Sequence, residues 1–385
     1  MADDQFPPEI IYKIFSRTPI KSLARFQCVS KLWLNYITHP YLQTIHPGSK
    51  QETMHPIIFQ QSHRPLRPGK KKECEISFLR VIQGTTNVQK HPVLNFCYGG
   101  PSYGTREKLV LGSCNGLILV RYVKNPGVVS DFFLMAVIDP LTKQRRDLPP
   151  VNVKIIGSDR TKEAAGIGID DSTHTLKTVF VIVGEEQKLQ NRQLCAKTMV
   201  HCPGNKVWRE IGETPAYPIS GEGVFGHGRL HWLVRRKIVW FDVKRERFGL
   251  TDPPDPNKAS WSRSYRRLVA LNDGEVGFAF VGDVCTELWV LKEDQEWVLG
   301  CWFDLDVSPV LRLRDGNVEV LGCWNEDGDI LLSCGRGNGR RLCVYGPKTG
   351  DFRRVVGVDD LGDAEVRMYR SNLFSRLTRF KTFKW

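Results

Sequence analysis

The sequence lacks the features that would direct the chain to a membrane or out of the cell. Its longest uninterrupted apolar run, Phe132 to Ile138, has seven residues, whereas a membrane-spanning helix needs roughly 20. The N-terminus, MADDQF, is acidic and has no apolar signal core. There is no C-x-x-C pair and no N-x-S/T glycosylation sequon in the 385 residues. We therefore expect no membrane partner, a location in the cytoplasm, the nucleus or both, and 11 cysteines that are reduced thiols.

Motifs for catalysis and cofactor binding are also missing. No G-x-S-x-G nucleophile elbow occurs. The glycine-rich string GRGNGR at 335–340 has no Lys-Ser/Thr after it and opens no helix pattern, so we interpret it as a hairpin loop. His227 and His231 are four residues apart, which would pair them on a helix. Their segment has a strand pattern instead, which separates such residues by about 13 Å. We expect no catalytic residue, no metal and no cofactor.

The chain is basic, with 55 Lys and Arg against 42 Asp and Glu and a net charge of +13. The basic residues form short scattered clusters, such as Arg235-Arg236-Lys237 and Arg353-Arg354, and every charged residue after Glu365 is positive. Neither zinc-finger spacing nor a basic amphipathic helix accompanies them, so nucleic acid is not an expected partner. An acidic protein partner, or solubility alone, remains as the interpretation of the charge.

The first 46 residues have a helical pattern. Pro7-Pro8 suits a first helical turn, apolar residues then recur at helical spacing, and Thr18-Pro19 ends this helix because the residue before proline avoids helical angles. A second helix fits Ile20 to Val29 and a third fits Ser30 to Ile37. Three helices of about nine residues form a domain too small to be comfortably stable alone. We therefore expect a partner to cover part of its apolar surface.

Almost everything after this segment has the pattern of short strands separated by turn residues, among them Asn115-Gly116, a strong hairpin dipeptide. A phrase of strand, polar turn and second strand recurs at points 61, 41, 49 and 55 residues apart. The mean, about 51, is close to the ~50-residue period of kelch blades. The pattern predicts an all-β, kelch-like β-propeller of about six blades, with two packed β-sheets as the alternative.

These patterns divide the chain into four parts. We predict a small all-α domain of three helices at 1–46, a basic linker rich in Pro and Lys at 47–75, the propeller-like β-domain at 76–358, and a basic tail at 359–385, for which a helix is one option.

The helical segment 6–40, FPPEIIYKIFSRTPIKSLARFQCVSKLWLNYITHP, resembles an F-box. That family begins with L-P-x-E, continues with I-L-x-R-L-P and ends with S-L-x-R-F-x-C-V-S-K-x-W. The matching residues here are Pro7, Glu9, Ile10, Ile14, Arg17, Pro19, Lys21, Ser22, Leu23, Arg25, Phe26, Cys28, Val29, Ser30, Lys31 and Trp33. Phe6 and Thr18 stand where the family has Leu. Phe6 keeps an apolar anchor and Thr18 loses one, which implies weakened adaptor binding at most.

Further motifs follow in a fixed order. GSCNGL at 112–117, VIDPLTKQRRDLPP at 137–150 (with Asp139 where Asn is usual), GIGID at 166–170 and GRLHWL at 228–233 are similar to the motifs of the plant F-box-associated domain. The two resemblances together cover nearly the whole chain. They imply a non-catalytic subunit of a Skp–cullin–F-box ubiquitin ligase, in which the F-box docks on a Skp-type adaptor that bridges to the cullin, while the β-domain captures a protein substrate. An F-box scaffold or inhibitor outside the ligase and a propeller enzyme are the alternatives.

The F-box resemblance also implies a set of adaptor-binding residues. They are Pro7, Glu9, Ile10, Ile14, Phe15, Pro19, Leu23, Val29, Lys31 and Trp33. We expect Ile10, Ile14 and Val29 among the residues that face the adaptor, although periodicity alone does not separate core from interface. No substrate contact can be assigned, but Trp261 and Tyr265 lie in a polar, basic stretch and are candidates for exposed recognition residues.

Overall fold

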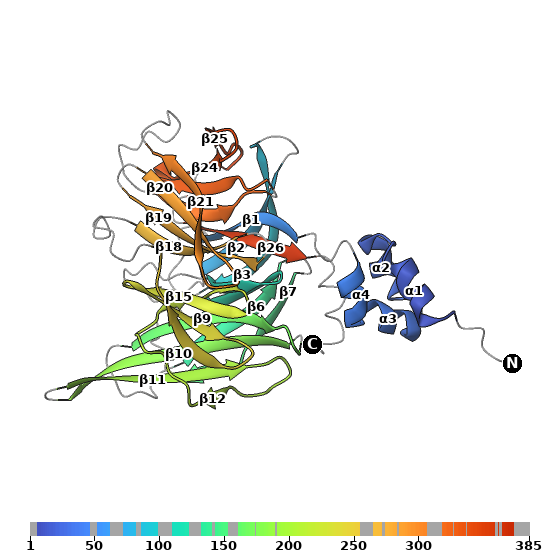
Figure 1. The fold of residues 1–385 in the computed structure, drawn as a ribbon, viewed down its shortest axis with the longest axis horizontal. Helices are drawn as coiled ribbons and strands as arrows, with labels where there is room; N and C mark the ends of the chain where they lie inside the picture. The colour runs from blue at the N-terminus through green and yellow to red at the C-terminus, as the bar shows by residue number, and fades with distance from the viewer. Residues whose placement is uncertain are drawn as a thin grey trace. The chain divides into compact units, whose positions relative to one another are not determined.

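A computed structural model gives the fold of the chain. It describes residues 6–46, 52–61, 72–81, 86–98, 110–122, 132–140, 143–152, 161–173, 175–188, 191–254, 265–271, 274–282, 285–305, 318–325, 327–335, 337–358, 361 and 364–372. The chain divides into two compact units, one made of residues 1–53 and 370–385 and one made of residues 54–369. We call the described helices at 6–46 the helical unit and the second compact unit the β-unit (Figure 1).

The helical unit contains four short helices rather than the three predicted. They are α1 (Pro8–Phe15), α2 (Ile20–Phe26), α3 (Lys31–Ile37) and α4 (Pro40–Ile45). The prediction extended the unit to residue 46 but placed no helix after Ile37, although proline is favourable at a first helical position. The His39 ring also caps this helix by accepting from the backbone N–H of Tyr41 at 3.2 Å. His39-Pro40 therefore starts a fourth helix within the predicted unit.

Every helix contributes a side chain to one small core. Phe15, Leu23, Ile37 and Leu42, one from each helix, are at most 2% exposed. Aromatic rings surround them, with Trp33 edge-on to Phe15 at 5.3 Å between ring centroids. Residue His46 closes the unit, since its ring Nε2 lies 2.9 Å from the carbonyl oxygen of Thr18 in the turn between α1 and α2.

The β-unit consists of six antiparallel sheets among the described residues. Sheet 1 has the order β26 (Glu365–Asn372), β1 (Glu52–Gln61), β2 (Lys72–Val81), β3 (Val88–Tyr98). Sheet 2 has β4 (Val110–Cys114), β5 (Leu117–Tyr122), β6 (Phe132–Asp139), β7 (Gln144–Asp147), with β8 (Val151–Asn152) beside β6. Sheet 3 has β12 (Arg209–Ile211), β11 (Asn191–His201), β10 (Thr175–Lys188), β9 (Thr161–Asp170) and a short parallel β13 (Gly221–Glu222).

The last three sheets are four-stranded meanders. Sheet 4 has β14 (Val224–Gly226), β15 (Arg229–Val234), β16 (Lys237–Asp242) and β17 (Arg247–Thr251). Sheet 5 has β18 (Tyr265–Ala270), β19 (Val276–Val281), β20 (Cys285–Leu291) and β21 (Trp297–Asp304). Sheet 6 has β22 (Val318–Cys323), β23 (Ile330–Cys334), β24 (Arg341–Gly346) and β25 (Asp351–Arg354), with the 3₁₀ turn η5 (Gly337–Gly339) after β23.

Two predicted hairpins are present. Asn115-Gly116 joins β4 to β5 with positive φ at both residues, 47° and 74°, the backbone that this dipeptide favours in a two-residue hairpin turn. GRGNGR joins the antiparallel strands β23 and β24, which confirms a hairpin loop in place of a phosphate-binding loop.

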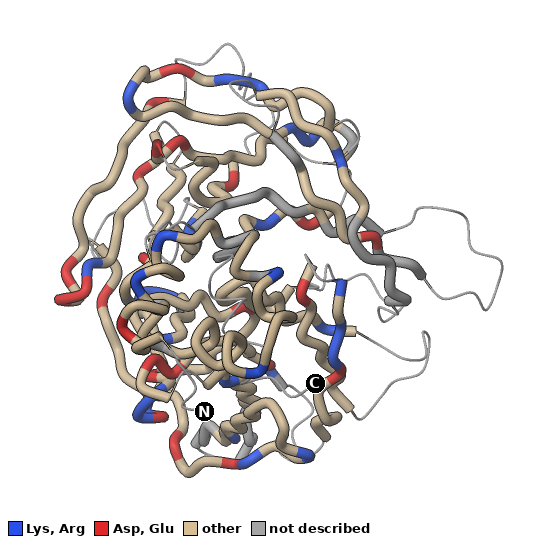
Figure 2. Tube along the Cα trace, turned by 90° about the vertical axis from the view of Figure 1, so that its right-hand side faces the viewer, with Lys and Arg blue, Asp and Glu red and all other residues tan. Residues whose placement is uncertain are grey.

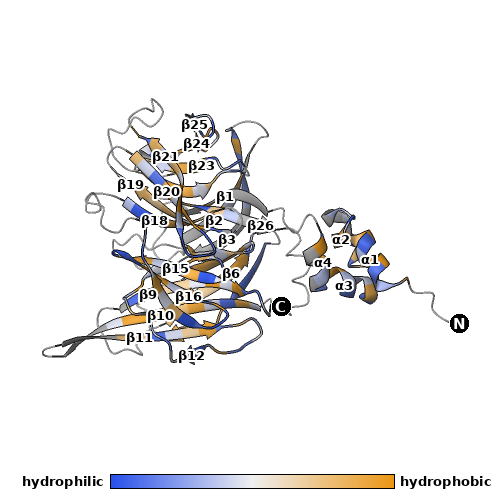
Figure 3. Cartoon of the chain, in the orientation of Figure 1, coloured by the Kyte–Doolittle hydropathy of each residue, from blue (hydrophilic) through white to orange (hydrophobic). Residues whose placement is uncertain are grey.

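The six sheets close into a ring, because each packs face to face on the next. Buried clusters shared by neighbouring sheets contain Tyr369 and Ile138 (sheets 1 and 2), Val181 and Trp232 (3 and 4), Ile238 and Phe278 (4 and 5), and Leu331 and Val366 (6 and 1). Ring contacts join Phe133 to Phe180 (2 and 3) and Phe303 to Tyr345 (5 and 6). A closed ring of such sheets is a β-propeller. This confirms the predicted fold with about six blades and excludes two stacked sheets. Apolar and polar residues are interspersed along the described strands (orange and blue in Figure 3).

The ring closes by combining the two ends of the β-unit in one sheet. Strand β26, from near the C-terminus, lies beside β1 in sheet 1 (red beside blue in Figure 1). The predicted boundaries are therefore wrong at both ends: β1 and the start of β2 lie inside the predicted linker at 47–75, and β26 lies inside the predicted tail at 359–385. The many polar residues of these strands, and the proline in β1, hid their pattern, because pairing with partners distant in sequence fixes them. Residues 373–385 lie outside the described residues.

Glycines on β9 let sheet 4 approach sheet 3 closely. A Cβ atom at Gly168 would lie 2.6 Å from the Phe225 ring and 2.9 Å from a Val243 methyl group. The two glycines of the GIGID motif are thus packing positions, as Gly166 also shows with 2.7 Å to Leu230.

We predict that Gly168→Ala lowers the free energy of unfolding by about 1–3 kcal/mol, because the new methyl group overpacks this contact. Gly212→Ala is the matched control, since a Cβ there meets nothing within 4 Å. Denaturant unfolding monitored by tryptophan fluorescence measures both. Equal stability of the two variants would contradict the packing role of Gly168.

Candidate functional site

The helical unit exposes large apolar side chains outside its core. Ile10 and Ile14, one turn apart on α1, are 44% and 54% exposed, and Val29, just before α3, is 62% exposed. Helical residues four apart lie on one face, so Ile10 and Ile14 form a continuous apolar strip. A unit of this size leaves such residues uncovered only at a cost in solubility, which marks the strip as a candidate docking surface.

The other predicted adaptor residues divide between surface and core. Pro7, Glu9, Pro19 and Lys31 are exposed and Trp33 is half-buried. Phe15 and Leu23 are 2% and 0% exposed. Their assignment to the adaptor surface is wrong, because these side chains form the centre of the core.

Sequence reasoning missed further exposed apolar residues in the same unit. Leu32 and Tyr41 are 38% and 50% exposed, and Phe6, noted only as a departure from the F-box pattern, is 69% exposed. The N-cap of α3 is the signal that could have placed Leu32 at the surface. The Ser30 hydroxyl accepts a hydrogen bond from the backbone N–H of Trp33 at 3.1 Å and so starts α3. This start turns Trp33 to the core and leaves Leu32 at the surface.

In the β-unit, charged side chains gather where the first strands of the sheets converge. Arg367 on β26 lies 3.2 Å from Glu222 on β13 and also pairs with Glu365, while Arg267 on β18 pairs with Glu319 on β22 and lies 3.7 Å from Glu222. Arg340 joins the cluster at 3.8 Å from Glu319. We call these six residues the axial cluster. It holds three arginines and three glutamates, so its formal charge is balanced.

Electrostatics and burial hold the axial cluster together. Burial opposes the charged form of Arg367, but the carboxylates of Glu222, Glu365 and Glu319 outweigh it, so the pKa of Arg367 lies above its ordinary value. The side chains of Arg367, Glu222 and Glu365 are 11–16% exposed. Removal of one member would leave a buried charge without its partner, which is far costlier than loss of a surface pair.

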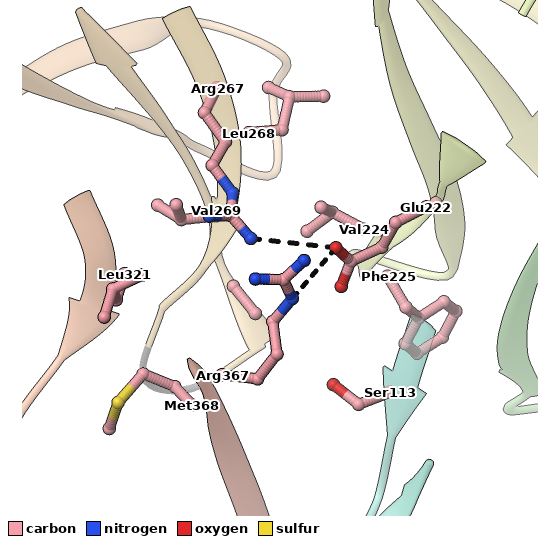
Figure 4. A pocket seen from close by; sticks show the side chains of 12 residues that line it. Ser113, Glu222, Val224, Phe225, Arg267, Leu268, Val269, Leu321, Arg367 and Met368 are labelled. Atoms are coloured by element: carbon pink, nitrogen blue, oxygen red, sulfur yellow. Dashed lines mark ion pairs between the residues drawn. The ribbon is translucent and has the colours of Figure 1, made fainter. Parts of the chain in front are cut away.

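A small pocket lies beside this cluster (Figure 4). All six sheets line it, through Ser113, Glu222, Gly223, Val224, Phe225, Arg267, Leu268, Val269, Ala270, Leu321, Arg367 and Met368. Figure 4 shows Arg267 and Arg367 converging from two strands on Glu222. The enclosed space holds about two water molecules. This small size favours a structural role for the pocket beside the axial cluster.

Of the two candidate recognition residues, only one can be placed. Trp261 lies outside the described residues. Tyr265, at the start of β18, is 43% exposed, and its hydroxyl donates to Glu319 at 3.3 Å. Burial and, after it, the Glu319 carboxylate raise the pKa of Tyr265. The residue thus stands at the border between the axial cluster and solvent, and its role in recognition stays a prediction.

The GIGID motif and the lysine after it form a second charged cluster, between sheets 3 and 4. The Lys177 ammonium lies 3.3 Å from Asp170 and 3.0 Å from Glu246, and donates to the Val243 carbonyl at 2.9 Å. Burial alone would raise the pKa of Asp170, but hydrogen bonds from Ser172 and the charge of Lys177 lower it to about 2. The motif is explained by blade packing.

Several residues of the basic clusters in the sequence are paired with acidic residues in the structure. Lys237 lies 2.5 Å from Asp252, Arg353 lies 2.6 Å from Asp329, and Arg145 lies 2.8 Å from Asp147. Blue and red segments are interspersed along the trace (Figure 2). No His, Cys, Asp and Glu group within the described ranges could hold a metal ion. None of the described helices has the length and apolar character that a bilayer span requires.

Comparison with known proteins decides the family. Residues 70–380 match the model of the F-box associated beta propeller domain, and residues 4–44 match that of the F-box domain. This chain is a member of the F-box proteins with an F-box-associated β-propeller. The matched ranges agree with the architecture, because the propeller match includes β26, which closes the ring, and the F-box match ends within α4.

Three curated relatives from Arabidopsis thaliana illustrate the relationship. F-box protein At3g07870 is 24% identical over 92% of this chain and 88% of its own length. F-box protein DOR is 24% identical over 90% and 83%, and F-box/kelch-repeat protein At3g23880 is 22% identical over 96% and 95%. The whole F-box and propeller arrangement is therefore shared with plant F-box proteins, as the motifs predicted.

We predict that Arg367→Met lowers the free energy of unfolding by about 3 kcal/mol, because Glu222 and Glu365 lose a buried partner. Lys348→Met is the control, since Lys348 and Asp327 form an exposed pair at 3.5 Å and such pairs contribute little. Thermal and denaturant unfolding measure the difference. If both variants unfold like the wild type, the axial cluster does not stabilise the ring.

A buried histidine leads us to predict that acid destabilises the F-box-associated propeller. His231 is fully buried, lies 3.3 Å from the Val224 carbonyl through Nδ1, and burial lowers its pKa to about 4. The folded propeller thus binds this proton less readily than the unfolded chain, whose histidines titrate near pH 6.5. The stability contributed by neutral His231 is complete above about pH 6.5 and is lost as pH falls towards 4.

We predict a loss of about 2–3 kcal/mol in the free energy of unfolding between pH 7 and pH 4.5 from this residue. His231→Gln removes the titrating ring and should flatten that slope, whereas His91→Gln, at an exposed position, should leave it unchanged. Urea unfolding at the two pH values measures the slopes. Parallel slopes for wild type and His231→Gln would show that another group controls acid stability.

Proposed function

We propose that this F-box protein is the substrate-recognition subunit of a Skp–cullin–F-box ubiquitin ligase. Its F-box docks on a Skp-type adaptor, the adaptor connects it to the cullin, and its propeller holds a target protein for ubiquitination. The chain performs no chemistry itself, because raising the local concentration of a target lysine near a charged conjugating enzyme is enough to accelerate transfer. We place this activity in the cytoplasm, the nucleus or both.

The observation that carries the proposal is the apolar surface of the F-box. Ile10, Ile14 and Val29 are exposed although four other apolar side chains fill the core. A partner that covers them would gain roughly 25 cal/mol for each Å² of apolar surface that it removes from water. The same burial would stabilise a unit that is too small to be robust alone.

The propeller supports the second half of the proposal. Its axial cluster and closed ring give a rigid scaffold, and connections at the ends of its strands are the usual place for recognition on such a scaffold. The charge-balanced cluster and the small pocket favour a structural role for the centre. A protein target is therefore expected at the surface of the propeller.

We predict that Ile14→Asp and Val29→Asp each weaken co-purification with a Skp-type adaptor at least tenfold, because each places a charge in the proposed apolar contact. Lys13→Ala, next to Ile14 and also exposed, should bind like the wild type. Co-purification of the full chain with adaptor and cullin measures both steps.

The outcomes separate the alternatives. Wild-type binding that survives both Asp substitutions would overturn the proposed surface. Adaptor binding without cullin would favour an F-box scaffold or inhibitor outside the ligase. Phe15→Ala serves as a folding reference, since it removes a core side chain and should act through loss of helical structure, visible by circular dichroism.

A further inference from the structure

The outer edge of sheet 5 differs from the outer edges of the other sheets. β21 is the last strand of that sheet, and no other described strand pairs with its free side. The outer strands of the remaining sheets, β3, β7, β12, β17 and β25, each contain Lys or Arg. Such charges protect an edge from pairing with another chain. β21, with the sequence WVLGCWFD, contains neither.

Apolar side chains flank this edge on both faces. Leu299 and Val298 are 45% and 48% exposed and Trp302 is 54% exposed. Leu299 lies opposite Trp289, which packs towards sheet 4, while Val298 lies opposite Val290, which packs towards sheet 6. An added strand would therefore find an apolar contact on each of its two faces.

A bulge limits how long such pairing can be. The register between β20 and β21 shifts at Gly300, the residue between Leu299 and Cys301. A Cβ at Gly300 would lie 2.9 Å from Val290 and 3.2 Å from the Leu288 carbonyl, so the bulge is fixed by its surroundings. Bulges bend a strand and interrupt its ladder. The edge thus suits one short segment and not an open-ended stack of strands.

Acidic residues border this apolar edge. The turn that leads into β21 carries Glu293, Asp294 and Glu296, all exposed, and Asp304 ends the strand. Acidic groups at both ends of an apolar edge, on a chain with a net charge of +13, favour a partner with basic ends. We propose that β21 docks an extended segment of a target protein, apolar in its centre and basic at its ends, as an added strand of sheet 5.

A second copy of this chain fits the edge less well. Antiparallel pairing of two β21 strands centred on Gly300 would place Glu296 of one copy opposite Asp304 of the other, and like charges directly opposite are unfavourable. The inference names the kind of target that the proposed ligase subunit takes and so rests on the proposed function. Its test uses no adaptor, so a failure here leaves adaptor binding unaffected.

The experiment uses the full chain and a fluorescein-labelled peptide with a centre of alternating Val and Thr and two lysines at each end. Fluorescence anisotropy measures its binding, with the same peptide ending in glutamates for comparison. We expect the lysine peptide to bind at least tenfold more tightly than the glutamate peptide. Leu299→Lys should weaken lysine-peptide binding at least tenfold, because it places a charge on the edge.

Leu250→Lys is the matched control, since Leu250 is also on an outer strand, β17, and is 44% exposed. It should bind the lysine peptide like the wild type. Val298→Lys repeats the test on the other face if Leu299→Lys fails to fold. Hydrogen exchange should show β21 amides protected by the peptide. Three results would each overturn the proposal. They are no binding at millimolar peptide, binding that is unchanged in both β21 variants, and a dimer of the chain that dissociates in those variants.

Discussion

The convergence of the first strands of six sheets on one axis is the constraint on which the β-unit depends. Each sheet is stabilised by apolar packing on its neighbours, but a ring can form only if the inner ends fit together. Small residues there allow close approach, and the charge-balanced axial cluster links β13, β18, β22 and β26 through arginine–glutamate pairs. Because these partners come from distant parts of the sequence, the cluster forms only when the ring is complete. It favours one closure over other arrangements of the same strands.

The helical unit is under a different constraint. The β-unit must close a large core, whereas the core of the helical unit is too small to cover all of its apolar side chains. Its four helices bury one apolar residue each at the centre and leave others, such as Ile14 and Val29, in solvent. More apolar surface is present than the unit can cover. Under the proposed function, this imbalance gives the adaptor its binding energy, and the same burial stabilises the helical unit.

Much of the fold could be predicted from the sequence, since alternation of apolar residues, a period near 50 residues and the Asn115-Gly116 turn all depend on local chemistry. β1 and β26 could not, because each is fixed by pairing with a strand distant in sequence. In the candidate site, the exposure of Ile10 and Val29 followed the expectation, whereas Phe15 and Leu23 did not. The apolar face of such a helix is wide enough to include both core and surface positions. Only tertiary packing decides which of its residues face inwards.

The same physical argument connects the F-box surface with the β21 edge. A soluble chain normally places charge wherever apolar surface or free backbone groups would attract another molecule, as five outer strands of this propeller do. Where such charges are missing, we expect a bound partner to cover the exposed apolar surface or backbone groups. Among the described residues, the strip around Ile14 and the strand from Trp297 to Asp304 are two places where apolar surface is exposed in this way. They lie in different units of the chain, which lets one partner bind without competing with the other for the same residues.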